Sequence, residues 1–216
     1  MKVGTDAVLL GAWIQMQECQ SILDVGTGSG VIALICAQRN QKAIIHGIDI
    51  HEDSVSDATF NFKNSPWAAR LKAQRCDFLK MKSAEPFDFI VSNPPFFSQS
   101  LHSSNPDRNA ARHDDLLPAE GFIIQAIKVL SANGQLALVI PHSEFDRWKH
   151  LANANLLHTS RLCHVFSTHD KAPNRMLVQW SKTPAILQEE NLIIRDQSSA
   201  FTQEYKTLTQ DLYLKF

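Results

Sequence analysis

The sequence predicts an α/β fold of the Rossmann-like, doubly wound type, with a seven-stranded sheet that is mostly parallel and has an antiparallel last strand. Two observations favour this fold. Short apolar runs alternate along the chain with segments of helical period. A glycine-rich turn joins the first apolar run to a helical segment. A length of 216 residues, 44% of them hydrophobic, suits one globular domain over residues 1–216.

The first half of the chain supplies an opening helix and four strands. Residues 1–17 hold the opening helix, which is expected from Asp6 to Met16. Its apolar face is formed by Val8, Leu9, Ala12, Trp13 and Met16. The strands are apolar runs that end at polar or turn residues, and the helices between them keep the 3.6-residue period. In chain order these segments are strand Ser21–Val25, helix Val31–Arg39, strand Ala43–Ile48, helix Glu52–Asn64, and strands Leu71–Cys76 and Phe87–Ser92.

The second half begins with a long polar connection, residues 97–117. Loops of this length in compact domains are usually functional or disordered, and we expect this one to bind substrate. A helix from Pro118 to Leu130 follows, with Asn133-Gly134 as its expected stop. Ser143 is expected to cap the next helix. The remaining segments are strand Gln135–Ile140, helix Ser143–Ala152, two antiparallel strands near Leu162–Ser167 and Met176–Lys182, and a C-terminal strand and helix within residues 184–216.

The C-terminal segment contains a short strand, Leu192–Arg195, and then a helix. Its apolar and aromatic residues recur at helical spacing, which predicts a face packed against the core. The residues of that face are Phe201, Tyr205, Leu208 and Leu212.

The composition narrows the class of protein. The four cysteines have no close pairing, and no stretch reaches the ~20 apolar residues of a membrane span, so a reduced, cytoplasmic protein is expected. None of the nine histidines has a spacing typical of a zinc site, so no metal is expected. The net charge of −1 does not indicate a broad surface for nucleic acid, but basic residues cluster locally. The clustered residues include Arg108, Arg112, Arg147, Lys149, Lys171 and Arg175.

The segment Asn93-Pro94-Pro95-Phe96 directly follows an apolar strand and is typical of a site that methylates an amino nitrogen. Such an amine is a poor nucleophile when its lone pair is delocalised. The Asn93 amide oxygen and the Pro94 carbonyl can each accept one N–H bond and so localise that lone pair. The prolines stiffen the loop. Phe96 would stack on the planar group, and a tight turn is the alternative reading.

The glycine-rich turn Gly26-Thr27-Gly28-Ser29-Gly30 lies between a strand and a helix, where backbone can approach a ligand closely. Val31 occupies the place of the third glycine of the dinucleotide pattern. Asp24, before the first glycine, would repel a pyrophosphate but attract an ammonium or sulfonium group. Asp49 ends the second strand, where an acidic residue suits a ribose diol. A plain turn for the glycines and helix capping by Asp49 are the alternatives.

With both motifs present, the chain resembles the class I S-adenosylmethionine-dependent methyltransferases. The resemblance implies that Gly26, Gly28 and Gly30 bind the amino-acid end of the cofactor. It also implies that Asp77 and Phe78 hold the adenine moiety, and that Asn93 contacts both cofactor and acceptor. No catalytic base is implied.

A closer resemblance is to the bacterial enzymes that methylate N6 of adenine 37 in a valine tRNA. It rests on Lys2-Val3-Gly4-Thr5-Asp6, Asn64-Ser65-Pro66-Trp67 and Tyr205-Lys206-Thr207-Leu208, and a short segment precedes the first of these in that family. The resemblance makes tRNA the expected partner. Phe97 would then join Phe96 in stacking, and the loop residues Arg108 and Arg112 would contact phosphates.

Other methyl acceptors remain possible, because guanine in ribosomal RNA, adenine in DNA and a protein glutamine are also methylated at such sites. Only about 20 residues precede Asp24, so the helical recognition domain of glutamine methylators is not expected. A cofactor-binding interaction protein without catalysis is the alternative from another class.

Overall fold

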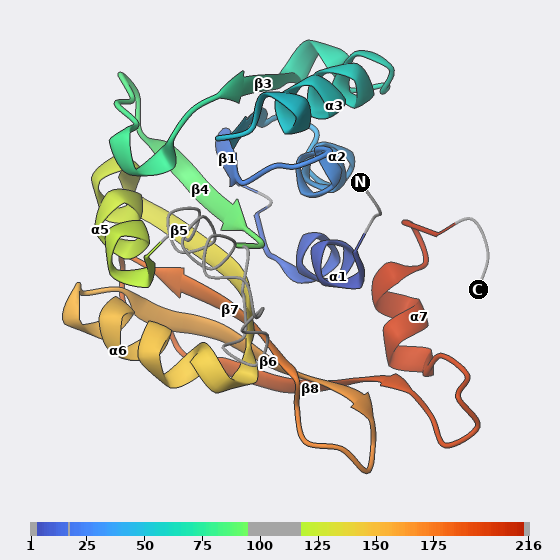
Figure 1. Cartoon of the computed structure of the whole chain (residues 1–216). Helices are drawn as coiled ribbons and strands as arrows, with labels where there is room; N and C mark the ends of the chain where they lie inside the picture. The colour runs from blue at the N-terminus through green and yellow to red at the C-terminus, as the bar shows by residue number, and fades with distance from the viewer. Residues whose placement is uncertain (1–3, 17, 95–117, 214–216) are drawn as a thin grey trace, which may run out of the picture.

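One eight-stranded sheet forms the centre of the computed structural model, which describes residues 4–16, 18–94 and 118–213 (Figure 1). The strands lie in the order β3-β2-β1-β4-β5-β7-β6-β8. All neighbours pair in parallel except β7, which is antiparallel to both β5 and β6. The bounds are β1 Ser21–Val25, β2 Ile44–Asp49, β3 Leu71–Arg75, β4 Phe87–Ser92, β5 Leu130–Pro141, β6 His158–Thr168, β7 Arg175–Ser181 and β8 Gln188–Arg195.

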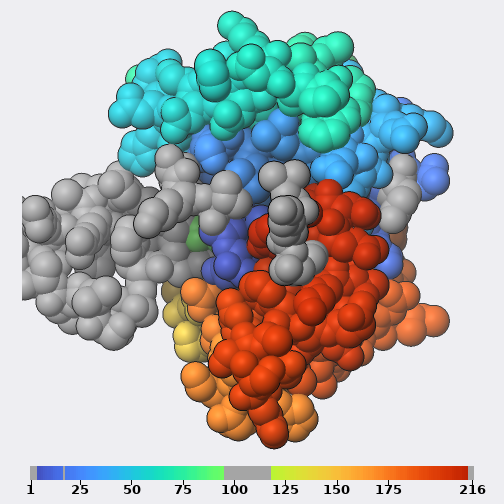
Figure 2. All heavy atoms as spheres, turned by 90° about the vertical axis from the view of Figure 1, so that its right-hand side faces the viewer, coloured from blue at the N-terminus to red at the C-terminus, as the bar shows by residue number. Residues whose placement is uncertain are grey.

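Helices cover both faces of this sheet and bury two apolar layers. One layer packs beneath α1, α2, α3 and α7, and the other beneath α5 and α6 (Figure 1). Figure 2 turns the first face to the viewer, with α7 in red below the blue and teal α2 and α3. The bounds are α1 Thr5–Trp13, α2 Val31–Arg39, α3 Glu52–Lys63, α5 Ala119–Val129, α6 Phe145–Ala154 and α7 Gln203–Thr209.

The predicted class of fold is confirmed, and the number of strands is corrected from seven to eight. The short strand predicted at Leu192–Arg195 begins at Gln188 and joins the sheet, parallel to β6. The first half of β8 is polar and exposed, so the apolar pattern of the sequence indicates only its second half. Cross-strand partners on β6 explain why it pairs: Glu190 accepts from Arg161 at 2.9 Å, and Glu189 bonds His164 at 2.7 Å.

Three local predictions were wrong. Helix α5 ends at Val129, next to the predicted Leu130, but Asn133-Gly134 is not its stop and lies instead in the irregular first part of β5. A Cβ on Gly134 would lie 3.1 Å from the Phe87 carbonyl oxygen, so a glycine here allows β5 to approach β4 closely. Ser143 does not cap α6, because His142–Glu144 forms a 3₁₀ turn before it. The opening helix ends at Trp13, short of the predicted Met16.

Contacts among Trp13, Arg161 and Glu190 join β8 to the first helix. The indole Nε1 of Trp13 donates to the Glu190 carboxylate at 2.6 Å, and the Arg161 guanidinium lies 4.4 Å from the centre of the indole ring. Arg161 also donates to the Trp13 carbonyl oxygen. One carboxylate therefore satisfies donors from α1 and β6.

We expect Glu190→Ala to lower the free energy of unfolding by about 1 kcal/mol, because two donors lose their acceptor at a half-exposed site. Glu190→Gln should lose less, since its carbonyl oxygen can still accept from Trp13. Urea denaturation measures both, with Glu85→Ala, at an exposed carboxylate before β4, as the control. Equal stability of the Glu190→Ala and Glu85→Ala variants would contradict the proposed role of this contact.

Candidate active site

Four predicted segments meet where the parallel strands end, which we call the carboxyl edge of the sheet. Asp77 follows β3, Asp49 ends β2, the glycine loop 26–30 follows β1, and Asn93 follows β4. These strands are neighbours in the sheet, and neighbouring strands lie about 5 Å apart. The four segments therefore form a row about 15 Å long.

The glycine loop turns sharply and is tied to the next strand. Gly26, Gly28 and Gly30 have φ of 70°, 56° and 84°, a backbone conformation that favours glycine. The N–H groups of Gly26 and Thr27 donate to the Ile48 carbonyl oxygen at 2.8 and 2.9 Å. These bonds fix the loop against the end of β2.

Gly30 must be glycine for packing as well. A Cβ there would lie 2.4 Å from the Phe62 ring on α3. By contrast, a Cβ on Gly26 would meet no atom of the described residues within 4 Å beyond its two chain neighbours, so among these residues space lies open beside that part of the loop. This open side can admit a ligand close to the backbone.

Asp24 lies fully buried beneath the loop. Its Oδ2 accepts from the Thr27 hydroxyl at 2.7 Å and from the Ala33 N–H of α2 at 3.2 Å. Its Oδ1 is buried without a hydrogen-bond partner among the described residues. Burial raises the pKa of Asp24 to about 7, and the Asp49 carboxylate adds to this, whereas the bonds from Thr27 and Ala33 lower it.

Asp49 is 8% exposed and is oriented by two backbone groups. Its Oδ2 accepts from the Gly28 N–H at 3.0 Å, and its Oδ1 accepts from the His51 N–H at 3.0 Å. Each carboxylate oxygen can accept more than one bond, so both retain capacity for hydroxyl donors. The carboxylate thus links the glycine loop to the start of α3 while keeping acceptors at the carboxyl edge.

Asp77 and Phe78 follow β3, but their side chains face different surroundings. Asp77 accepts from the Leu79 N–H at 3.0 Å and pairs with Lys80 at 3.2 Å. The Phe78 ring is 3% exposed, and its centre lies 4.9 Å from that of Phe122 in the core. Phe78 can therefore offer a ligand its backbone but not its ring.

Asn93 is half-buried and Pro94 is buried at the end of β4. The Ser92 hydroxyl donates to the Val25 carbonyl oxygen at 2.7 Å, which ties the ends of β4 and β1 together. Pro95, Phe96, Phe97, Arg108 and Arg112, like the whole of residues 97–117, lie outside the described residues, so their roles stay predictions.

Thr27, Gly47 and Ser92 are site residues that sequence reasoning missed. Thr27 holds Asp24, and Gly47 makes room for it, because a Cβ on Gly47 would lie 2.7 Å from the Thr27 hydroxyl oxygen. Thr27 lies within the glycine-rich turn and Ser92 lies directly before Asn93-Pro94-Pro95-Phe96, and these positions were a signal for them. Gly47 lies mid-strand, where a glycine indicates close approach.

The described residues contain no cluster of three His, Cys, Asp or Glu side chains that could hold a metal ion. Within the same part of the chain, no helix is long and apolar enough to cross a membrane.

Solved methyltransferases share this fold. A predicted O-methyltransferase from Agrobacterium tumefaciens is 20% identical, with a TM-score of 0.74 over 95% of this chain and 96% of that one. TrmN from Thermus thermophilus is 18% identical, with a TM-score of 0.59 over 82% of this chain and 48% of that one. At these identities the likeness concerns the fold alone.

Sequence relatives are more specific. The model of the methyltransferase small domain family matches residues 2–164. A Vibrio vulnificus protein named tRNA1(Val) (adenine(37)-N6)-methyltransferase is 37% identical over 215 residues, which is 100% of this chain and 90% of that protein. A Parabacteroides distasonis protein of the same name is 39% identical over 218 residues, covering 100% and 92%. The chain therefore belongs to the methyltransferase small domain family and, through these full-length relatives, to the family of the tRNA1(Val) (adenine(37)-N6)-methyltransferases.

Proposed function

We propose that the chain methylates N6 of adenine 37, beside the anticodon of a valine tRNA, with S-adenosylmethionine as the methyl donor. One observation carries the proposal: Ser92 pairs with Val25, so Asn93 leaves the sheet directly beside the glycine loop. The names of the full-length relatives supply the acceptor.

The glycine loop fits S-adenosylmethionine, which when bound supplies an electrophilic methyl group on a positively charged sulfur. Asp24 Oδ1 is a buried acceptor without a partner among the described residues, and a carboxylate attracts an ammonium or sulfonium group. The open side of Gly26 allows close approach of the ligand. Val31 replaces the third glycine of a dinucleotide site, so NAD is not expected to bind.

The row of segments along the carboxyl edge matches the parts of this cofactor in order. Asp77 and the backbone of Phe78 would hold the adenine, and Asp49 would accept from the ribose hydroxyls. The backbone from Gly26 to Gly30 would contact the amino-acid end. Asn93, last in the row, would then face the methyl group.

Asn93 and Pro94 would act on the acceptor amine. The Asn93 amide oxygen accepts one N–H and the Pro94 carbonyl oxygen the other, which directs the nitrogen lone pair toward the methyl carbon. The leaving group departs uncharged, so no acid is needed, and the proton left on nitrogen passes to solvent. These residues therefore contribute mainly by orienting the nucleophile.

The substrate would be an RNA loop, in which the target adenine is unstacked at modest cost. The alternatives are another amino acceptor, such as guanine N2 in ribosomal RNA or a protein glutamine, and a cofactor-binding protein without catalysis. The relatives' names favour adenine in tRNA. Transfer of labelled methyl to total tRNA, followed by mass mapping of N6-methyladenine, separates all of these.

Asn93→Ala should reduce turnover at least ~100-fold with little change in tRNA affinity, because the amine loses a group that orients it. Asn93→Asp should retain more activity, since it keeps an acceptor oxygen, although its charge could tighten ground-state binding of the cofactor. Single-turnover methylation of tRNA measures these rates. Asn155→Ala, after α6, is the matched control. An Asn93→Ala variant within about threefold of wild type would remove Asn93 from catalysis.

Asp49→Ala should weaken S-adenosylmethionine binding by roughly 1 to 3 kcal/mol, the cost of unmet partners of a charged hydrogen bond. Titration calorimetry measures the affinity, with Asp53→Ala, an exposed acid on the first turn of α3, as the control. Because Asp49 also holds Gly28 and His51, thermal unfolding should accompany the titration. Unchanged affinity in a folded Asp49→Ala variant would exclude Asp49 from the cofactor site.

Asp24 should make cofactor binding depend on pH. The pKa of Asp24 is about 7 in the folded protein and near 4 in the unfolded chain. Between these values the unfolded chain loses the proton more readily, so the free energy of unfolding should fall as pH rises from about 4 to about 7. A cationic ligand favours the ionised carboxylate, so S-adenosylmethionine affinity should rise as pH increases through about 7. Calorimetry across this range should show the rise in wild type and lose it in Asp24→Asn. The same pH profile in both proteins would reject this role.

A further inference from the structure

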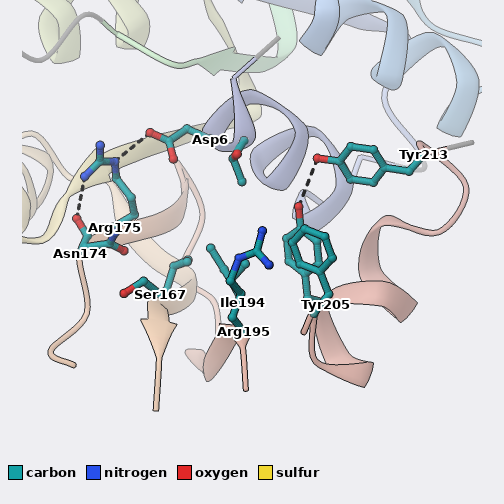
Figure 3. Close-up of a pocket in the computed structure, with 11 residues that line it drawn as sticks. Asp6, Ser167, Asn174, Arg175, Ile194, Arg195, Tyr205 and Tyr213 are labelled. Carbon is teal, nitrogen blue, oxygen red and sulfur yellow. Dashed lines mark hydrogen bonds and ion pairs between the residues drawn. The ribbon is translucent and has the colours of Figure 1, made fainter. Parts of the chain in front are cut away.

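A cavity of about 370 Å³ lies beside α1 and α7 (Figure 3). The first turn of α1, the ends of β6 and β8, the start of β7, and α7 with the segment after it line this cavity. Because β7 is antiparallel, its start lies beside the ends of its neighbours. The cavity therefore opens at the same carboxyl edge as Asn93.

Arg195 is the cation that distinguishes this cavity. In Figure 3 its guanidinium points into the space between Asp6 and Arg175 on one side and Tyr205 and Tyr213 on the other. It lies 4.2 Å from the centre of the Phe201 ring and donates one hydrogen bond, at 2.6 Å, to the Ser199 carbonyl oxygen.

These contacts orient the Arg195 guanidinium without neutralising it. Among the described residues, no carboxylate lies within ion-pair distance of it. A guanidinium has five N–H donors, so donors remain for an anion.

The second arginine of the cavity is already paired. Arg175 Nε donates to the Asp6 carboxylate at 2.8 Å, and its Nη1 donates to the Asn174 carbonyl oxygen at 3.0 Å. Among the described residues, the cavity lining thus holds two arginines and one acid, which leaves a net positive charge contributed by Arg195. Ser167 and Thr5 add hydroxyl groups that can bond phosphate or ribose oxygens.

The distance from Asn93 suits a nucleotide a few positions along the RNA from the target adenine. Asn93 follows β4, and Ser167 near the end of β6 lies three strands further along the sheet. At about 5 Å per strand the separation is about 15 Å, which a few nucleotides of single-stranded RNA can span.

The lining also lies largely outside the part of the chain that the general methyltransferase model matches. That model ends at residue 164, whereas Ser167, Arg175, Arg195 and Tyr205 come later. The tRNA1(Val) relatives, by contrast, match 100% of the chain. The cavity is therefore made mainly of residues that lie beyond the general methyltransferase model, in a part of the chain that the tRNA1(Val) relatives also match.

We propose that this cavity binds the phosphate of a nucleotide flanking the methylated adenine, with Arg195 as the phosphate ligand. The inference rests on the proposed function and adds a second contact with the RNA on the same edge of the sheet. Arg195 is a positioning residue here, because it touches the RNA backbone but not the reacting atoms.

Removing the charge should weaken RNA binding without affecting chemistry. In Arg195→Gln we expect the KM for tRNA to rise about tenfold, the scale of one charged hydrogen bond, with kcat and S-adenosylmethionine affinity unchanged. The slope of log affinity against log salt should decrease by about 0.7 to 1, as for one lost phosphate contact. Arg195→Lys should keep most of the slope.

Two further variants complete the experiment. Lys128→Gln removes one exposed charge at the opposite edge of the sheet and should change neither KM nor the salt slope. Ser167→Asp leaves the Ser199 contact of Arg195 intact and adds a negative charge to the cavity, so it should also raise the KM for tRNA. Thermal unfolding and cofactor titration show that each variant is folded.

The outcomes separate this inference from the proposed function. Wild-type protein that methylates no tRNA would overturn the proposed function and this inference with it. If wild type methylates tRNA and both Arg195→Gln and Ser167→Asp keep its KM and salt slope, only the role of the cavity fails. Arg195-dependent binding of adenosine monophosphate or inorganic phosphate, with tRNA KM unchanged, would identify a site for a free anion and would also overturn the inference.

Discussion

The parallel pairing of β1 with β2 on one side and β4 on the other is the constraint on which the candidate site depends. Val25 lies opposite Ile48 and Ser92 in the two pairings, so the glycine loop leaves the sheet between Asp49 and Asn93. A slip of one residue in either pairing would turn the side chains of that strand to the other face. The backbone and hydroxyl bonds across these strand ends fix the register where the chemistry would occur.

The carboxylate of Asp24 lies buried at the centre of this arrangement and adds an electrostatic requirement to it. Asp24 organises the loop through Thr27 and the start of α2, but its second oxygen is buried without a partner among the described residues. An unpaired buried charge is costly, and a bound cation would lower that cost. The ligand-free protein is thus less stable around the loop than it would be with a cationic cofactor, and binding and local order are coupled.

Local chemistry explains which features could be predicted from the sequence. The helix Val31–Arg39 and the strands Ser21–Val25 and Phe87–Ser92 carry strong apolar and turn signals, and their predicted bounds are confirmed. Strand β8 begins with polar residues, so its place depends on partners such as Arg161, far away in sequence. The role of Gly47 likewise depends on a side chain from another strand. Contacts between distant segments are what sequence periodicity does not contain.

The site has two halves, one that would bind the cofactor and one that would bind the surroundings of the methyl acceptor. The glycine loop and Asp49 would recognise groups that any S-adenosylmethionine presents, and backbone amides and a single carboxylate suffice for that task. An acceptor in RNA differs from one in a protein mainly in its surroundings, above all in its phosphates. Selection among acceptors should therefore depend on the half built by β6, β7, β8 and α7, where Arg195 adds a positive charge. A methyltransferase of this fold that acts on an uncharged acceptor would have no need of that arginine, while its need for Asp49 would be the same.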